Sequence, residues 1–249
     1  MLKDKVIIVT GASQGLGFAM SKGCAENGAT VIMSARTIDK LEAAVKELSE
    51  NGYKCVAKPM DVTNLSDITK VVNEVIAEYG HIDGLVNNAG MTSKVKFLES
   101  SIADYDEVMN ANLKSVYMCC RIVCEQMAKQ KKGSIVNISS VAAETGGGLL
   151  GTSLYASAKG GVISMTKGLA RELAPYGIRV NTLAPGCIDT PATTVNRDPA
   201  QYQASIKKIL LQRRGRPEDV VASTLLLLSD SSSFITGTTL DVNGGVYMR

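Results

Sequence analysis

The sequence predicts an α/β protein with one doubly wound parallel sheet of about seven strands and helices on both faces. Short apolar runs rich in β-branched residues alternate with longer amphipathic stretches from one end of the chain to the other. Runs that are apolar throughout are typical of strands in a parallel sheet covered on both faces. The 249 residues contain no repeat, linker or low-complexity tract, so we expect a single domain over residues 1–249.

The strands are expected where the apolar runs fall, with a helix after most of them. The expected strands are Val6–Thr10, Thr30–Ser34, Lys54–Lys58, Ile82–Val86, Ser134–Ile138, Arg179–Leu183 and, at the edge, Thr238–Val242. The expected helices are Gly15–Asn27, Lys40–Asn51, Leu65–Tyr79, Ile102–Gln130, Tyr155–Tyr176 and Glu218–Ser229. The helices that begin at residues 102 and 155 are apolar on more than one side, which indicates either a contact between subunits or a thick core.

The composition argues against several classes of function. A formal net charge of +3 is too small to indicate binding to nucleic acid or to a membrane surface. No run reaches the roughly 18 apolar residues of a membrane span, and the first residues do not read as a signal peptide, so we expect a cytoplasmic protein. The single histidine, His81, and six cysteines without paired spacing predict no metal site.

A glycine-rich turn joins the first expected strand to the first expected helix. It reads Gly11-Ala-Ser13-Gln-Gly15-Leu16-Gly17. Glycines there allow a tight turn and a close approach of the backbone to a pyrophosphate, which the N-terminus of the following helix attracts. The spacing G-x3-G-x-G departs from the usual G-x-G-x-x-G, but its place at the first strand–helix junction predicts a dinucleotide site.

The same residues also spell G-x-S-x-G, the nucleophile turn of α/β-hydrolases, with Ser13 as the candidate nucleophile. That reaction needs a histidine late in the chain, after the serine and an acid. His81 is the only histidine, and it precedes most of the strands. The sequence therefore favours a nucleotide site over a hydrolase.

The end of the second expected strand indicates which dinucleotide binds. An acid at this place binds the ribose hydroxyls of NAD, whereas an arginine accommodates the 2′-phosphate of NADP. The chain has Arg36 there and no acid until Asp39. A guanidinium is always charged and suits a phosphate. We therefore predict that NADP(H) is preferred, with NAD(H) as the alternative.

Tyr155 and Lys159 are four residues apart in an expected helix, so they share one face, about one turn or roughly 6 Å apart. A free tyrosine has a pKa near 10, and a cation held close to the phenol lowers that pKa. A tyrosine so placed is a usable general acid and base. Ser140 lies fifteen residues upstream.

Five motifs follow one another along the chain. They are Thr10-Gly-Ala-Ser-Gln-Gly-Leu-Gly17, Asn87-Asn-Ala-Gly90, Asn112 within Asn-Ala-Asn-Leu, Ser140 after Asn-Ile-Ser, and Tyr155-x-x-x-Lys159, with Pro185-Gly186 and Thr190 behind them. In this order they resemble the short-chain dehydrogenase/reductase family over nearly the whole chain. The resemblance implies a Rossmann fold and hydride transfer between a nicotinamide cofactor and a ketone, aldehyde or secondary alcohol.

The resemblance also implies a role for each matching residue. Tyr155 is the general acid/base, and Lys159 lowers its pKa and binds the nicotinamide ribose. Ser140, favoured by register over Ser139, bonds the substrate oxygen, and Asn112 holds a water that links Lys159 to solvent. The implied cofactor-binding residues are Gly11, Ser13, Gly15, Leu16, Gly17, Arg36, Asp61, Val62, Asn88, Ala89, Gly90, Tyr155, Lys159, Pro185, Gly186, Ile188 and Thr190.

The substrate is less well indicated. Residues 187–212, helical from about residue 200, resemble a mobile lid over the nicotinamide. The most similar subgroup, the 3-oxoacyl-ACP reductases, docks the acidic carrier with two arginines, where this chain has Lys131 and Tyr176. We therefore expect a reductase of a small ketone or hydroxy compound. A 3-oxoacyl-ACP reductase and a non-catalytic NADP-binding sensor are the alternatives, and the resemblance implies a homotetramer.

Overall fold

The computed structural model describes residues 1–148, 151–194 and 198–249. Within these ranges seven strands form one sheet in the order β3-β2-β1-β4-β5-β6-β7, and every neighbouring pair is parallel. The strands are β1 (Val6–Thr10), β2 (Thr30–Ser34), β3 (Cys55–Ala57), β4 (Gly84–Asn87), β5 (Gly133–Ile138), β6 (Ile178–Pro185) and β7 (Thr239–Val242). The sheet is doubly wound, as predicted.

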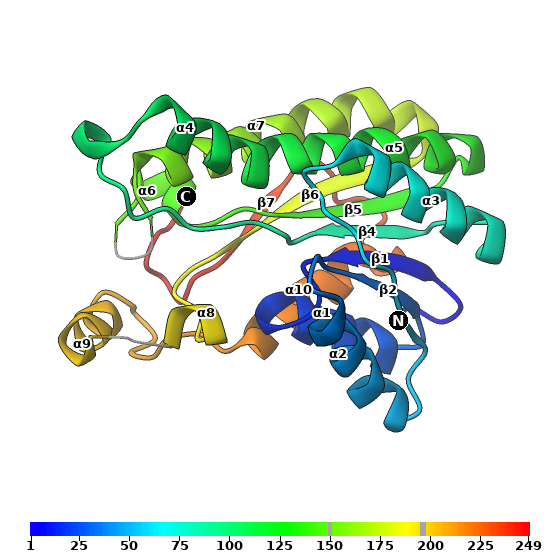
Figure 1. The fold of residues 1–249 in the computed structure, drawn as a ribbon, viewed down its shortest axis with the longest axis horizontal. Coiled ribbons are helices and arrows are strands. Elements are labelled where there is room, and N and C mark those ends of the chain that lie inside the picture. The colour runs from blue at the N-terminus through cyan, green and yellow to red at the C-terminus, as the bar shows by residue number, and fades with distance from the viewer. Residues whose placement is uncertain (149–150, 195–197) are drawn as a thin grey trace.

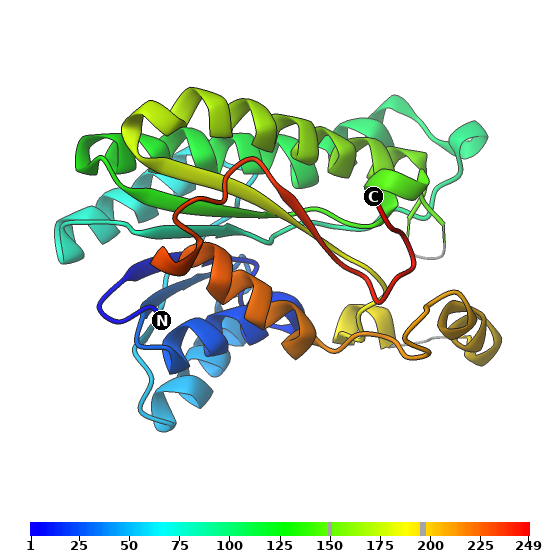
Figure 2. The same ribbon diagram turned by 180° about the vertical axis from the view of Figure 1, so that it is seen from behind.

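Helices cover both faces of the sheet (Figure 1). One layer contains α3 (Leu65–Tyr79), α4 (Ile102–Met109), α5 (Ser115–Gln130) and α7 (Ser153–Leu173). The other contains α1 (Gly15–Glu26), α2 (Ile38–Glu50) and α10 (Pro217–Leu228). Seen from behind, β7 is the edge strand and α10 lies beside α1 under the sheet (Figure 2).

The core has two halves, one on each side of the sheet. Ile8 and Val72 belong to the half under α3, α5 and α7, whereas Ile7, Met20 and Leu227 belong to the half under α1, α2 and α10. Successive residues of β1 therefore enter opposite halves, as the alternation of side chains along a strand requires. This explains why the strands are apolar throughout rather than alternating with polar residues.

The chain changes winding direction between β1 and β4, which are neighbours in the sheet. In open α/β sheets a crevice for ligands forms at such a switch point, at the carboxyl ends of the strands. The turn after β1 and the segment after β4 meet there. This places the glycine-rich turn and the Asn-Asn-Ala-Gly motif side by side.

The predicted helix over residues 102–130 is one continuous element, but its middle is not α-helical. Residues Asn110–Lys114 form a π-helical turn between α4 and α5. Two short helices were not predicted from the sequence pattern, α6 (Ala142–Thr145) and α8 (Pro191–Thr194), whereas the helix expected from about residue 200 is α9 (Pro199–Lys207). Both α8 and α9 lie beyond the carboxyl edge of the sheet (Figure 1).

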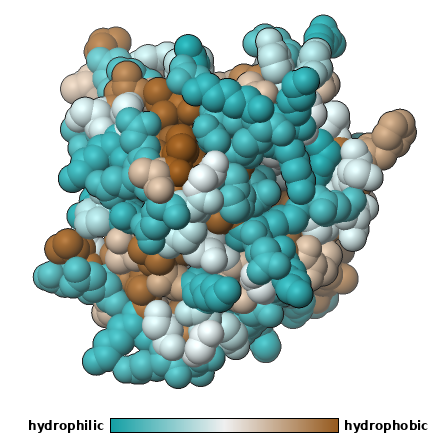
Figure 3. Space-filling view, turned by 90° about the vertical axis from the view of Figure 1, so that its right-hand side faces the viewer, coloured by the Kyte–Doolittle hydropathy of each residue, from teal (hydrophilic) through white to brown (hydrophobic). Residues whose placement is uncertain are grey.

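The strands begin at the opposite edge of the sheet. Figure 3 faces this side, which is mostly hydrophilic and carries smaller hydrophobic patches. Among the residues that the structure describes, no helix is long and apolar enough to cross a membrane.

Candidate active site

The glycine-rich turn has the geometry that a phosphate site needs. Gly11 and Gly15 adopt φ values of +64° and +60°, which a residue with a side chain adopts only under strain. A side chain at Gly17 would overlap the carbonyl oxygen of Gly11, so α1 begins directly against the end of β1. The free N–H groups at the start of α1 therefore face the crevice.

Thr10 and Asn88 tie the two sides of the switch point together. The Thr10 hydroxyl accepts hydrogen bonds of 3.0 Å from the backbone N–H groups of Asn88 and Ala89. The Asn88 amide donates to the carbonyl oxygens of Thr10 and Gly11, at 2.9 and 3.1 Å. Asn88 therefore holds the glycine-rich turn from behind, and its contacts are with the backbone of the turn.

A cleft of about 880 Å³ opens in front of this turn. Eleven of the predicted cofactor residues line it: Gly11, Ser13, Gly15, Leu16, Arg36, Asp61, Val62, Asn88, Ala89, Gly90 and Thr190. The cleft runs from the ends of β2 and β3 to the segment after β4. Its size and its mixed polar and apolar lining suit an extended dinucleotide.

The end of the cleft near β2 is basic. Arg36 is exposed there beside Asp61. Burial would raise the pKa of the Asp61 carboxyl, but hydrogen bonds from Thr63 at 2.8 and 2.9 Å and the charge of Arg36 lower it on balance. Asp61 is therefore ionised and held in place, while Arg36 extends to solvent.

Several residues that line this cleft were not predicted from the sequence. Gln14, Thr37 and Lys40 are among them, as are residues of the π-helical turn such as Asn110 and Lys114. Arg36 and Lys40 lie on either side of the first residues of α2, and both line the cleft. The short interval between these two cations is a signal that the sequence contains.

Tyr155 lies at the start of α7, and the nearby Ser140 side chain lowers the pKa of its phenol. Ser139, the neighbour of Ser140, is buried, and its hydroxyl donates a 2.8 Å bond to the carbonyl oxygen of Lys159. The Ser140 hydroxyl instead accepts a 3.1 Å bond from the N–H of Ala142, and Ser140 is the serine that affects the pKa of Tyr155. Its contact with a substrate oxygen stays a prediction.

Lys159 is buried, and the loss of hydration lowers its pKa to about 8. Its ammonium donates to the carbonyl oxygen of Ile138 at 2.8 Å and lies 5.9 Å from the centre of the Tyr155 ring. Burial raises the pKa of Tyr155, and the Ser140 side chain lowers it only in part. The expected net lowering of the tyrosine pKa by Lys159 is therefore not found in the protein alone, because desolvation is the larger effect.

Asn112 lies in the π-helical turn and is fully buried. Its amide oxygen accepts from the N–H of Met91 at 3.2 Å, and its amide nitrogen donates to the carbonyl oxygens of Met91 and Val108 at 2.9 Å. A Cβ on Gly90 would lie 2.6 Å from the Asn112 oxygen and 3.5 Å from the Lys159 nitrogen. Gly90 therefore lets these two side chains lie close to the end of the cleft. The water expected at Asn112 stays a prediction.

The other predicted cofactor residues do not line the cleft. Pro185 ends β6, and Gly186 donates its N–H to the carbonyl oxygen of Val242 at 3.0 Å. The Ile188 side chain is buried in the core half under α10. The predicted lid over residues 187–212 includes 195–197, which lie outside the described residues, and its mobility stays a prediction.

The hydrolase alternative fails on distance. Ser13 follows β1 at the carboxyl edge of the sheet, whereas His81 precedes β4 at the amino edge. There the His81 ring bonds the carbonyl oxygen of Tyr79 at 2.8 Å and lies 3.2 Å from Asp83. The only histidine of the chain cannot activate Ser13.

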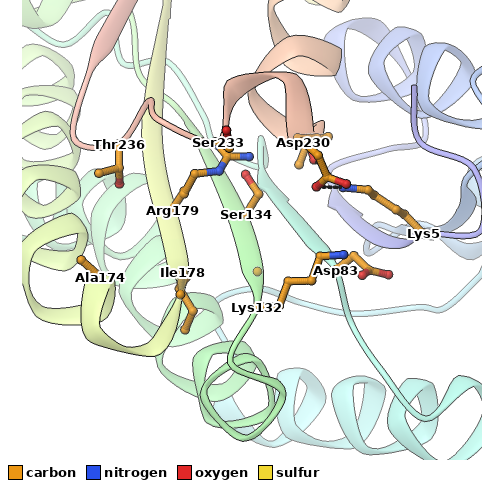
Figure 4. Close-up of a pocket in the computed structure, with 13 residues that line it drawn as sticks. Lys5, Asp83, Lys132, Ser134, Ala174, Ile178, Arg179, Asp230, Ser233 and Thr236 are labelled. Atoms are coloured by element: carbon orange, nitrogen blue, oxygen red, sulfur yellow. Dashed lines mark hydrogen bonds and ion pairs between the residues drawn. The ribbon is translucent and has the colours of Figure 1, made fainter.

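A smaller cavity of about 340 Å³ lies at the amino edge, between the starts of β5 and β6 and the segment after α10 (Figure 4). Lys5 points to Asp230 there, with 2.7 Å between nitrogen and oxygen. Arg179 donates to the carbonyl oxygens of Leu227 and Ser229, at 2.7 and 3.0 Å. These contacts fasten α10 to the sheet, and the cavity is remote from Tyr155.

Known proteins share this arrangement. A family model described as "Enoyl-(Acyl carrier protein) reductase" matches residues 11–247. The 3-oxoacyl-[acyl-carrier-protein] reductase FabG of Thermotoga maritima is 41% identical over 245 residues, which are 98% of each chain. The crystal structure of gox2181 has a TM-score of 0.95 at 32% identity, covering 98% of this chain and 96% of that one. A putative gluconate dehydrogenase from Agrobacterium tumefaciens has a TM-score of 0.93 at 31% identity, with the same coverage.

The fold and the site define an oxidoreductase that acts on an alcohol or carbonyl group with a nicotinamide cofactor. The chain belongs to the short-chain dehydrogenase/reductase family.

Proposed function

We propose that this protein is an NADP(H)-dependent reductase that interconverts a ketone or aldehyde and a secondary alcohol, with Tyr155 as the general acid/base. The observation that carries the proposal is the group at the inner end of the cleft. Ser140 lies close enough to Tyr155 to lower its pKa, Lys159 lies one turn behind the tyrosine, and Gly90, which lines the dinucleotide-sized cleft, lies beside Lys159.

The residues of the cleft suit the cofactor. The glycine-rich turn and the start of α1 would hold the pyrophosphate, and Arg36 and Lys40 would bind a 2′-phosphate. When bound, the nicotinamide supplies or accepts the hydride. Tyr155 gives a proton to the substrate oxygen in reduction and removes it in oxidation. Ser140 donates a hydrogen bond to that oxygen and stabilises the charge that develops on it.

We propose small ketones and hydroxy compounds as the first class of substrate. Tyr176, where the carrier-dependent enzymes have a cation, is 48% exposed. Gly177, the residue after Tyr176, packs against the carbonyl group of Lys131, so Lys131 lies close to Tyr176. Lys131 is exposed. The pair therefore presents one cation to an acidic carrier instead of two.

A second candidate is the reduction of 3-oxoacyl groups on acyl carrier protein, which the name of the Thermotoga maritima relative supports. The two candidates differ in what Lys131→Ala would do. Loss of this cation would lower kcat/KM for a carrier-bound substrate several-fold and would leave a free ketone or short thioester unaffected. Comparable losses on both substrates would count against a docking role.

Further expectations remain proposals of the same kind. The two helices that were expected to begin at residues 102 and 155 are apolar on more than one side, which suits a homotetramer. The mass of the protein in solution can be measured by light scattering. A cytoplasmic location and a mobile lid over residues 187–212 belong to the same proposal.

The direct test is to follow NADPH and NADH oxidation with a panel of ketones, aldehydes and acyl thioesters, using the unmodified protein and Tyr155→Phe. We expect Tyr155→Phe to abolish turnover and to bind NADPH nearly as before. Substantial residual activity of Tyr155→Phe would contradict the assignment of Tyr155 as the general acid/base. Tight NADPH binding by the unmodified protein without turnover on any substrate would favour the sensor.

A further inference from the structure

Arg214 is a buried cation outside the group that surrounds Tyr155. Its side chain is only 4% exposed and lies in the segment that leads from α9 to α10. The guanidinium donates to Asp189 at 2.7 Å and to the Ser205 hydroxyl at 2.9 Å, and it lies 5.3 Å from the centre of the Tyr202 ring. One side chain therefore joins the segment after β6 to two residues of α9.

The backbone next to Arg214 reinforces the same connection. Gly215 donates its N–H to the carbonyl oxygen of Cys187 at 2.9 Å, and Asp189 donates to that of Gly215 at 2.8 Å. The strip from residue 187 to 189 is thus held by the backbone of Gly215 and by the guanidinium of Arg214. Elements that lie beyond the edge of the sheet (Figure 2) are fixed by these contacts.

Burying a guanidinium costs free energy of hydration, and a buried ion pair adds little net stability. What the planar, forked group does provide is a defined direction for each of its bonds. The effect of Arg214 should therefore appear in where these segments sit more than in how stable the protein is.

The position of these segments matters for the cleft. Thr190 follows Asp189 directly, and Thr190, Pro191 and Thr193 line the cleft. The Thr190 side chain lies 3.5 Å from where a Cβ of Gly15 would be, so it lies directly beside the glycine-rich turn. Arg36, at the other end, is held by none of these contacts.

We propose that Arg214 is a positioning residue that fixes Asp189 and thereby places Thr190 over the part of the cofactor between the pyrophosphate and the nicotinamide. The proposal rests on the proposed use of NADP(H). It assigns a function to a residue that touches neither the cofactor cleft nor the catalytic group. Its consequence is selective: the nicotinamide half of the cofactor should bind less tightly without Arg214, and the adenosine half should bind equally well.

The test measures the dissociation constants of NADPH and of adenosine 2′,5′-bisphosphate, which lacks the nicotinamide half, for Arg214→Met. We expect NADPH to bind about tenfold more weakly, with the bisphosphate within a factor of two of the unmodified protein. An equal weakening of both ligands, or of neither, would overturn the proposal.

Arg213→Met is a matched control. Arg213 is the adjacent residue, 51% exposed, and bonds both oxygens of Asp219 on α10, at 2.7 and 2.9 Å. Its loss also removes an arginine–carboxylate pair, but not one that contacts the segment after β6. Both dissociation constants should stay unchanged, and a loss of NADPH binding equal to that of Arg214→Met would contradict the proposal.

Ser205→Ala is the second variant, in case Arg214→Met fails to fold. It removes one acceptor of the guanidinium and keeps the charge pair, so we expect a smaller shift in the same direction, about two- to threefold for NADPH alone. An unchanged NADPH constant would count against the proposal. Failure of the proposed function itself looks different, because the unmodified protein would then bind neither ligand or show no turnover.

Discussion

The ammonium of Lys159 donates a 2.8 Å hydrogen bond to the carbonyl oxygen of Ile138, the last residue of β5. A charged group is thus held inside the protein at the carboxyl end of a central strand, one helical turn behind Tyr155. Its pKa is lowered to about 8 because burial disfavours the charged form. Several measurable consequences depend on how this small group of side chains is packed.

Lys159→Met should make the protein without cofactor more stable at pH 7, by an amount that shrinks toward pH 10. The pKa in the folded protein, about 8, lies below the 10.5 of the free group. Between these values the unfolded chain binds more protons, so the stability of the unmodified protein rises with pH. The shift corresponds to roughly 3 kcal/mol as an upper limit.

Urea unfolding of both proteins at pH 7 and pH 10 checks this difference. Lys167→Met, which changes an exposed lysine of the same helix, is the control and should show no pH-dependent gain. A gain for Lys159→Met that is equal at the two pH values would contradict the assigned pKa. Catalytic turnover should be lost in any case.

Gly90→Ala should greatly reduce turnover without unfolding the protein. The added Cβ would lie 2.6 Å from the Asn112 oxygen, so the amide and the nearby Lys159 must shift. A displacement of about 1 Å at such a site costs about 100-fold in rate. Steady-state kinetics and circular dichroism measure the two effects separately.

Gly168→Ala is the matched glycine control for that variant. Gly168 lies in α7, is exposed, and a Cβ there meets nothing within 4 Å. Alanine in place of glycine inside an exposed helix should raise stability by about 0.5–1 kcal/mol with unchanged kinetics. Full activity of Gly90→Ala would show that the site accommodates the methyl group.

Ser140→Ala should mainly lower kcat, whereas Ser139→Ala should mainly lower the stability of the protein. Removal of the Ser140 hydroxyl, which lies near Tyr155, should lower kcat by about 100- to 1,000-fold with little change in stability. Removal of the Ser139 hydroxyl leaves the Lys159 carbonyl oxygen without its 2.8 Å donor and should cost about 1 kcal/mol of stability, with kcat changed only a few-fold. Equal kinetic losses in both variants would show that the serines are not distinguished by their contacts.

Arg36→Ala should raise KM for NADPH by about 10- to 100-fold and leave KM for NADH nearly unchanged. The reason is the loss of a charged hydrogen bond to the 2′-phosphate, which is worth about 1.5–3 kcal/mol. Lys46→Ala, which removes an exposed cation of α2 paired with Glu50, is the control and should affect neither cofactor. Equal changes for NADPH and NADH would contradict the assignment of Arg36.

The strands were predicted from sequence because their residues are apolar on both sides, a pattern that only a covered parallel sheet explains. All seven predicted strands are present, and β1 and β2 have the predicted bounds. The short helices α6 and α8 were not predicted, because four residues are too few to show a helical period.

Some residues of the site were predicted from the sequence and others were not. The glycine-rich turn, Ser140, Tyr155 and Lys159 stand out by residue type and spacing, and the structure brings them to one edge of the sheet. Ile188 was expected at the cofactor because the family resemblance implies it, and its side chain belongs to the core. Arg214 stands in a run of polar residues that reads as surface, and nothing in that run indicates a buried cation.

The π-helical turn between α4 and α5 sets how the two helices are rotated about their common axis. Such a turn holds one more residue than a regular helix would use. Deleting one residue among 110–114 would therefore turn α5 by about 100° relative to α4. Val116, Cys120 and Val123 would then leave the core, even if Asn112 were kept. Insertions and deletions that a surface loop tolerates are forbidden here, so the length of this segment should be invariant wherever the amide of Asn112 is used.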